Sequence, residues 1–175
     1  MLRRLGTLPV LAVSGTIMVV THLVIHTFFV PGTGGTLLDF QLTGAAAQDA
    51  LMLIKSRPNA VGIHLYLSAG VDMLYPLAYG IFVAGLCFRY GAPRGGLFAL
   101  PILAAAGFDI AENVVQVIAL TGDPEILALK TVLTPAKFGL AAIGSLIAIW
   151  LWARTTFGGR PLDDFFHFPG QRSER

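Results

Sequence analysis

The residues best suited to chemistry in this sequence are charged and amide side chains that interrupt long apolar runs. The run from Leu97 to Leu120 contains Asp109, Glu112, Asn113 and Gln116. At 3.6 residues per helical turn these four side chains fall on one face of a helix. Carboxylates near the centre of a bilayer are costly, so this face must point toward protein or water and away from lipid. The pattern predicts a polar site inside a membrane-embedded helix.

A second apolar run, from Val61 to Phe88, carries a polar stripe at intervals of three or four residues. Its members are His64, Ser68, Asp72, Tyr75 and Tyr79. Pro76 follows Asp72 by four residues, so it removes the backbone hydrogen bond that the Asp72 carbonyl would otherwise accept. We expect the carboxyl group and the freed carbonyl of Asp72 to point into the same interior.

The run from Ile126 to Ala153 contributes lysines and a threonine: Lys130, Thr134 and Lys137. Lys130 lies close to the start of the run, and we expect its amine to extend to the outer membrane interface. Lys137 is central, and an unpaired central lysine is costly. We therefore expect Lys137 to lie within ion-pair reach of Asp109 or Glu112.

The first apolar run contributes His22 and His26, which are four residues apart. Such a pair could hold a metal or face a haem, but histidines at this spacing are more often hydrogen-bonded within a bundle. We therefore predict neither a metal nor a cofactor. Tyr75 and Tyr79 have a similar ordinary interpretation as packing residues with satisfied hydroxyls.

Helix geometry places the charged groups at similar depths. At a rise of about 1.5 Å per residue, Asp72, Asp109 and Lys137 each lie roughly 15 Å from the end of a span. Three central acids against one central lysine leave a charge unpaired, so at least one acid is expected to be neutral or to share a proton. That arrangement is typical of acid/base or proton-transfer sites. The acid/base candidates are Asp72, Asp109, Glu112 and Lys137, and the predicted ligand contacts are His64, Tyr75, Tyr79, Asn113, Gln116, Thr134 and His22.

Composition defines the class of protein. The mean hydropathy of +0.72, with 55% apolar and 13% charged residues, lies outside the range of ordinary soluble domains. A formal net charge of +2 and the lack of a basic stripe argue against nucleic-acid binding. One cysteine, Cys87, excludes an internal disulfide and any two-cysteine metal or redox motif. We expect a single all-α membrane domain over residues 1–175.

The apolar runs predict a polytopic four-helix bundle with spans at about residues 8–30, 61–88, 97–120 and 126–153. The first run is too long for a signal-peptide core and lacks a small-residue cleavage site, so we interpret it as retained. In the outer loop, residues 31–60, a short helix is expected from Thr43 to Arg57. Its stripe of Ala47, Leu51 and Ile54 is typical of an interfacial helix. We interpret it as a connector, with a lid over an outward-opening polar interior as the alternative.

Arginines alternate with acidic residues between the predicted spans. They occur before the first span, in the second loop and after the fourth span: Arg3, Arg4, Arg89, Arg94, Arg154 and Arg160. Lys55 and Arg57 in the first loop run against this pattern. The third loop, Thr121–Glu125, is acidic instead. The positive-inside rule therefore predicts that both termini lie in the cytoplasm and that the protein resides in the cytoplasmic membrane. The aromatic residues of the tail, 155–175, are expected at the level of the lipid headgroups.

Three motifs resemble those of a group of small four-span membrane proteins: Asp72-x-x-Tyr75-Pro76-x-x-Tyr79, Asp109-x-x-Glu112-Asn113 and Lys137-Phe138. This resemblance implies the same architecture. More distantly, the first span, the helical outer loop and the acid before a proline are similar to the emopamil-binding/sigma-2 receptor group. In that group buried acids bind amines and sterols, and one branch isomerises a sterol double bond. By position, the resemblance would give these roles to Asp72 and Glu112.

Three functional hypotheses fit these observations. The first, which we favour, is an enzyme or receptor-like binder for a lipid-like molecule that enters from the bilayer, with acids as proton donor and acceptor. The second is a small transporter or proton-coupled carrier, since intramembrane ionisable residues and proline-broken helices also mark ion routes. The third is an accessory subunit whose ion pairs serve assembly. Membrane lipids are the expected partners, and a homo-oligomer or a larger membrane complex fits all three hypotheses.

Overall fold

Four long helices dominate the computed structural model, which describes residues 2–29 and 43–158. These residues contain helices and no strand, so the predicted all-α class is confirmed. Four helical segments are long and apolar enough to cross a membrane: Leu8–Thr27, Ala60–Tyr90, Gly95–Thr121 and Pro124–Phe157. Each of these segments overlaps one of the apolar runs seen in the sequence.

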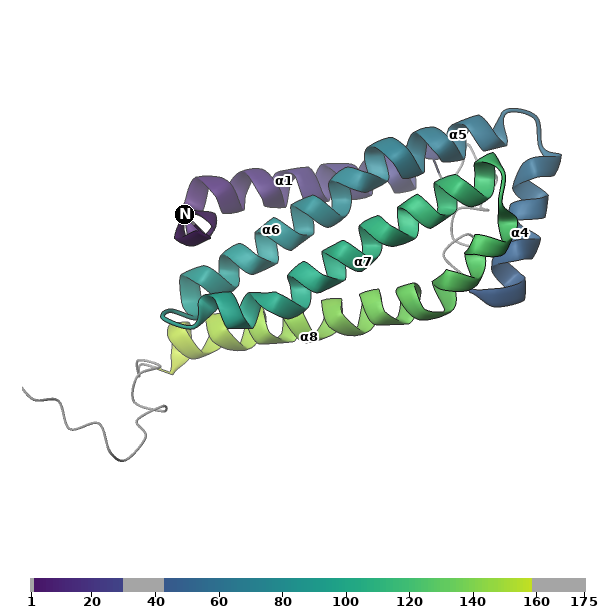
Figure 1. Cartoon of the computed structure of the whole chain (residues 1–175). Helices are drawn as coiled ribbons and strands as arrows, with labels where there is room; N and C mark the ends of the chain where they lie inside the picture. Colours follow the sequence, from purple (N-terminus) through teal and green to yellow (C-terminus); the bar gives the residue numbers. More distant parts are fainter. Residues whose placement is uncertain (1, 30–42, 159–175) are drawn as a thin grey trace, which may run out of the picture.

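The long helices run side by side in Figure 1. Short helical turns of other pitch interrupt or precede them. The first span joins α1 (Leu8–Val24) to η2 (Ile25–Phe29), a π-helical turn, and follows the 3₁₀ turn η1 (Leu2–Gly6). The second joins α5 (Ala60–Tyr66), the π-helical turn η3 (Leu67–Val71) and α6 (Asp72–Tyr90). The third is α7 (Gly95–Thr121), and the fourth joins the 3₁₀ turn η4 (Pro124–Leu129) to α8 (Lys130–Phe157).

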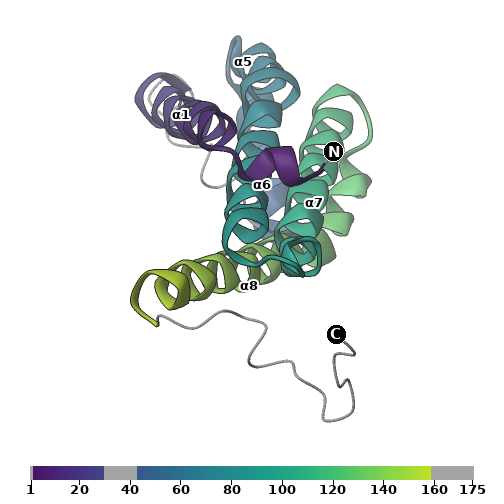
Figure 2. The same ribbon diagram turned by 90° about the vertical axis from the view of Figure 1, so that its left-hand side faces the viewer.

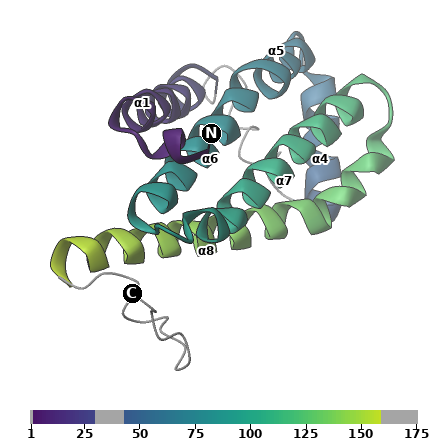
Figure 3. The same cartoon turned by 60° about the vertical axis from the view of Figure 1, so that its left-hand side comes forward.

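Helix α7 packs against both α6 and α8, whereas α1 packs mainly against α6 (Figures 2 and 3). Glycines permit the closest approaches. A Cβ on Gly85 of α6 would lie 2.6 Å from the carbonyl oxygen of Leu5, and one on Gly144 of α8 would lie 2.7 Å from the Cβ of Ile102. Small residues at such crossings allow membrane helices to approach closely. Helix α1 stands beside α6 and away from α7 (Figure 2).

The predicted helix of the outer loop is present as α4 (Gly44–Ser56). Ala47, Leu51 and Ile54 are buried as the stripe predicted, and Thr43 precedes the helix without a side-chain cap. Helix α4 lies across one end of the bundle (Figure 1) and forms an apolar cluster there with residues of α7 and η4. The crosswise orientation fits a helix in the membrane interface.

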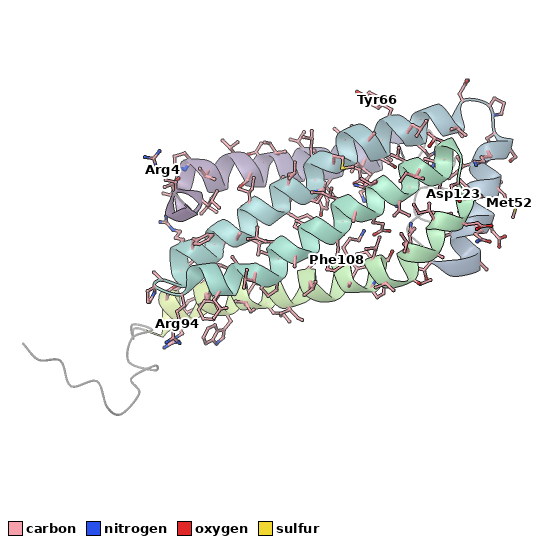
Figure 4. All side chains as sticks on the ribbon, viewed as in Figure 1. Arg4, Met52, Tyr66, Arg94, Phe108 and Asp123 are labelled. Atoms are coloured by element: carbon pink, nitrogen blue, oxygen red, sulfur yellow. The ribbon has the colours of Figure 1, made fainter. Side chains whose placement is uncertain are left out.

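The arginines Arg4 and Arg94 lie at one end of the bundle, and Asp123 lies at the other, together with Lys55 and Arg57 of the α4 segment (Figure 4). Figure 4 shows Arg4 and Arg94 at one end, and Asp123 together with Met52 of α4 at the other. At the basic end, the Arg89 guanidinium donates a hydrogen bond to the Gly6 carbonyl over 3.2 Å. The predicted orientation depends on the position of the arginines at one end of the bundle. The predictions for the tail aromatics and for residues 31–42 fall outside the described residues.

Candidate functional site

A row of ion pairs joins α7 to α8 near the middle of the bundle. The Lys137 amine lies 3.0 Å from Asp109 Oδ1 and 2.7 Å from Glu112 Oε2. The Lys130 amine lies 3.1 Å from the other oxygen of Glu112. The prediction that Lys137 meets Asp109 or Glu112 is confirmed, and it meets both. Along the row the charges alternate in sign, from Asp109 through Lys137 and Glu112 to Lys130.

The prediction for Lys130 is wrong. Its side chain is fully buried and turns inward to Glu112, which is fully buried as well. The Thr134 hydroxyl donates a further hydrogen bond to Glu112 Oε1 over 2.9 Å. The apolar cluster under α4 includes Leu127 of η4, one turn before Lys130, and covers the end of the bundle there. The buried cluster therefore has two lysines, and the sequence-based count of one central lysine was too low.

Asp72 contributes its backbone to this network. The Asn113 amide donates a hydrogen bond to the Asp72 carbonyl oxygen over 3.1 Å. Pro76 lies inside α6 and leaves that oxygen without its helical donor. The expectation of a freed carbonyl that points into the interior is therefore confirmed. The π-helical turn η3 ends directly before Asp72, so the helix is irregular on both sides of this residue, as is common at functional sites.

A cavity of about 530 Å³ lies between α1, α6, α7 and α8. One part of its wall is polar and consists of His22, His26, Asp72, Tyr75, Tyr79, Asp109 and Lys137. The other part is mainly apolar and includes Met18, Ile25, Phe82, Val83, Ile102, Phe138 and Ala141, with Ser145 beside them. The cavity thus combines a polar group of side chains with an apolar chamber.

Within the polar wall, Asp109 has a partner on each oxygen. Oδ1 faces Lys137, and Oδ2 accepts a hydrogen bond from the Tyr79 hydroxyl over 3.2 Å. Aromatic rings continue this wall: the ring centroids of Tyr79 and Tyr75 are 5.4 Å apart, and those of Tyr75 and His22 are 6.0 Å apart. Asp109 is therefore held in one orientation at the edge of the cavity.

The structure divides the predicted site residues into two groups. Asp72, Tyr75, Tyr79, Asp109, Lys137 and His22 line the cavity. Glu112, Asn113, Thr134, Gln116 and His64 are buried in the core and lie outside its lining. The prediction that Asp72 and Glu112 share one cavity is therefore wrong, because Glu112 lies behind Lys137. Asp109 takes the place expected for Glu112.

The core group forms its own hydrogen bonds toward the α4 end. The Ser68 hydroxyl donates to Gln116 Oε1 over 3.3 Å, and His64 Nδ1 lies 2.9 Å from the Ala60 carbonyl oxygen. Among the described residues, none from α4 lines the cavity, and an apolar cluster of α4, α7 and η4 residues lies beneath that helix. The expectation of a polar interior that opens beneath the first loop stays a prediction, because residues 31–42 of that loop lie outside the described residues.

The two histidines lie side by side, with ring centroids 4.4 Å apart. Within residues 2–29 and 43–158, no set of three His, Cys, Asp or Glu side chains is placed to hold a metal ion. His26 lines the cavity with His22, although only His22 was predicted as a ligand contact. The spacing of four residues was the signal that placed both on one helix face.

Several other cavity residues were missed as well: Met18, Ile25, Phe82, Val83, Ile102, Phe138, Ala141 and Ser145. A signal existed for two of them, since Ala141 and Ser145 follow Lys137 at intervals of four residues and share its face of α8. For the apolar residues no such signal existed, because the lipid-facing sides of the same helices are equally apolar.

Together the fold and the site define a class: a helical bundle with four candidate membrane spans, a buried row of alternating charges and a polar cavity beside it. No family model matches the chain, and no curated protein or solved structure does so either. The resemblances carried by the motifs around Asp72, Asp109 and Lys137 therefore remain predictions.

Proposed function

We propose that this chain is an integral membrane protein that binds a lipid-like molecule in the cavity and alters it by acid/base chemistry. The observation that carries the proposal is the composition of the cavity wall. Carboxyl, amine, hydroxyl and imidazole groups cluster in one part, and aliphatic and aromatic side chains form the rest. Small-molecule sites combine an apolar lining with a few polar groups that fix orientation in this way.

The position of the cavity supports entry from the bilayer. Its walls include α1 and α8, which lie apart on either side of α6 (Figure 2). A molecule with an apolar body can pass between these two helices without leaving the hydrocarbon region. Its polar group then reaches Asp72, Tyr79 and Lys137.

A count of charges among the described residues supports different roles for the acids. Asp109 and Glu112 are neutralised by Lys137 and Lys130. Asp72 has no ion-pair partner among the described residues. An unpaired carboxylate at the bilayer centre costs about 2.5–3.5 kcal/mol on insertion scales. Asp72 therefore holds a proton at rest and acts as the donor.

Asp109 is the matching acceptor. It is ionised opposite Lys137, oriented by Tyr79, and faces the same cavity as Asp72. A neutral acid and a carboxylate held in different environments can give and take a proton on opposite sides of one ligand. The carrier hypothesis has less support, because an apolar cluster of α4, α7 and η4 residues lies at the end of the bundle through which a polar route would pass.

Mass spectrometry of lipids extracted from the purified protein tests the proposal. A Phe in place of Ala141 fills the cavity, whereas a Phe in place of Leu146, which is 66% exposed on the same helix, leaves it open. We expect a bound amphiphile in the wild type and in Leu146→Phe, and its loss in Ala141→Phe. Asp72→Asn should retain the melting temperature and lower the bound amount. Equal lipid content in all four proteins would refute the proposal.

A further inference from the structure

The lysines of this chain, Lys55, Lys130 and Lys137, lie in three different environments. Lys55 is exposed on α4, and Lys130 is fully buried behind Glu112. Lys137 is 6% exposed, and that small exposure faces the cavity. Its amine is the only lysine nitrogen among the described residues that a molecule in the cavity can reach.

Two carboxylates surround this amine. Asp109 Oδ1 is 3.0 Å from the Lys137 nitrogen and Glu112 Oε2 is 2.7 Å from it. One carboxylate is enough to neutralise a lysine, and Glu112 already has Lys130 on its other oxygen. The surroundings of the Lys137 nitrogen therefore stabilise positive charge there strongly, whichever chemical group carries it.

The walls next to the amine are aromatic. The Phe138 ring centroid lies 4.9 Å from the Lys137 nitrogen, and Tyr75, Tyr79 and Phe82 line the same cavity. Such walls fit an extended or flat apolar chain better than a polar metabolite. A buried lysine with restricted water access is the side chain that proteins use to form Schiff bases with carbonyl compounds.

We propose that Lys137 condenses with a lipophilic aldehyde, a long-chain or polyene aldehyde that enters from the bilayer, to form a protonated Schiff base. The proposal rests on the proposed function, because the aldehyde occupies the same cavity. It identifies the chemical class of the ligand and assigns Asp109 and Glu112 as counter-ions of the iminium group.

The steps balance with the residues present. The Lys137 ammonium gives a proton to Asp109, and the free amine attacks the aldehyde carbon. The carbonyl oxygen takes a proton from Asp72, and the new C–N nitrogen returns one to Asp72. The hydroxyl then leaves as water with the proton held by Asp109, while the nitrogen lone pair forms the C=N bond. An ammonium and an aldehyde thus become an iminium and water, and both acids regain their starting states.

Reductive trapping tests the proposal on the full chain reconstituted in lipid nanodiscs. Hexadecanal is added as the probe, cyanoborohydride reduces any imine, and peptide mass spectrometry maps the adducts. We expect an adduct at Lys137 and its loss in Lys137→Arg, which keeps the positive charge and cannot form an imine. Lys55→Arg is the matched control and should retain the adduct at Lys137. A melting temperature for each variant shows that it is folded.

Hexadecanol, which cannot condense with an amine, separates this proposal from the proposed function. Excess hexadecanol should lower labelling at Lys137 and leave labelling at the exposed Lys55 unchanged. Adducts at Lys55 with none at Lys137 would overturn the Schiff base. In that case, the wild type could still retain hexadecanol while Ala141→Phe loses it. This result would support the proposed binding function without the Schiff base. Retention of hexadecanol by neither protein would overturn both.

Discussion

Replacement of Lys137 by Met removes the cation that Asp109 and Glu112 share. Glu112 keeps Lys130 at 3.1 Å, whereas Asp109 keeps the Tyr79 hydroxyl and loses its ion-pair partner. Loss of one partner from a buried ion pair costs about 3–5 kcal/mol, because the other charge stays buried. We expect the free energy of unfolding of Lys137→Met to fall by an amount in this range.

The second change decides which acid depends on Lys137. Lys137→Met with Asp109→Asn leaves the Glu112–Lys130 pair balanced, so this double variant should be more stable than Lys137→Met alone. We expect a coupling of about 2–3 kcal/mol, at the upper end for residues in contact. Interhelical hydrogen bonds in membranes average only about 0.6 kcal/mol, so the ion pair is distinguishable from a polar contact. Lys137→Met with Glu112→Gln should recover less, because it leaves Lys130 without its carboxylate.

Circular dichroism monitors the unfolding of the purified variants in mixed detergent and gives the required free energies of unfolding. Lys55→Met, on the exposed face of α4, is the matched control and should behave as the wild type. Additive losses in the Lys137–Asp109 cycle would mean that these charges do not meet. Equal recovery by both acid replacements would mean that Glu112 is not shared with Lys130.

Three more predictions follow from the fold. A cysteine at Ala45, in a cysteine-free background, should react with an impermeant thiol reagent on intact cells; reaction only after the cytoplasmic face is opened would reverse the predicted topology. Asn113→Ala should lower the free energy of unfolding by about 1–3 kcal/mol, because it leaves the part-buried Asp72 carbonyl without a hydrogen-bond donor. Adding Pro76→Ala should reduce that cost by restoring the helical donor, and an unchanged cost would contradict the role given to the proline. Gly144→Ala should lower the free energy of unfolding by about 1–3 kcal/mol, because the added methyl group overpacks against α7. Gly139→Ala, with open space around its Cβ, should lower it less in a thermal unfolding assay of both variants. Equal effects would contradict the close packing at Gly144.

The helices could be predicted because their signals are local. Hydrophobic length marks a span, and a period of 3.6 residues gives each helix a face. The same logic found α4 and its buried stripe of Ala47, Leu51 and Ile54. The bond from Asn113 to the Asp72 carbonyl was also within reach, since a proline four residues later always frees that oxygen.

Lys130 was misjudged because its environment depends on a distant segment. A lysine near the end of a span normally reaches water along its own helix. Here α4 lies across that end and Leu127 packs beneath it, so the amine turns inward to Glu112. Nothing in the sequence around Lys130 states where α4 will dock.

The lining of the cavity could not be predicted for a related reason. It depends on which helices are neighbours, and α1 packs mainly against α6 because Gly85 and Gly6 allow the chains to meet at one end. That pairing leaves the polar wall of α1, with His22, open toward α8. Helical periodicity gives the faces of each helix and not the order in which helices stand around one another.

The charges of the row are divided between two consecutive helices, and this has a consequence for membrane insertion. Helix α7 alone carries Asp109 and Glu112, each costing about 2.5–3.5 kcal/mol near the bilayer centre. Helix α8 supplies both matching lysines, and only the short turn η4 separates the two helices. For these two candidate spans, insertion into a bilayer as a hairpin with the charges already paired would have the lowest free-energy cost. A nascent chain that ends before α8 would carry two carboxylates without their lysines, and its α7 segment would insert into a membrane less favourably.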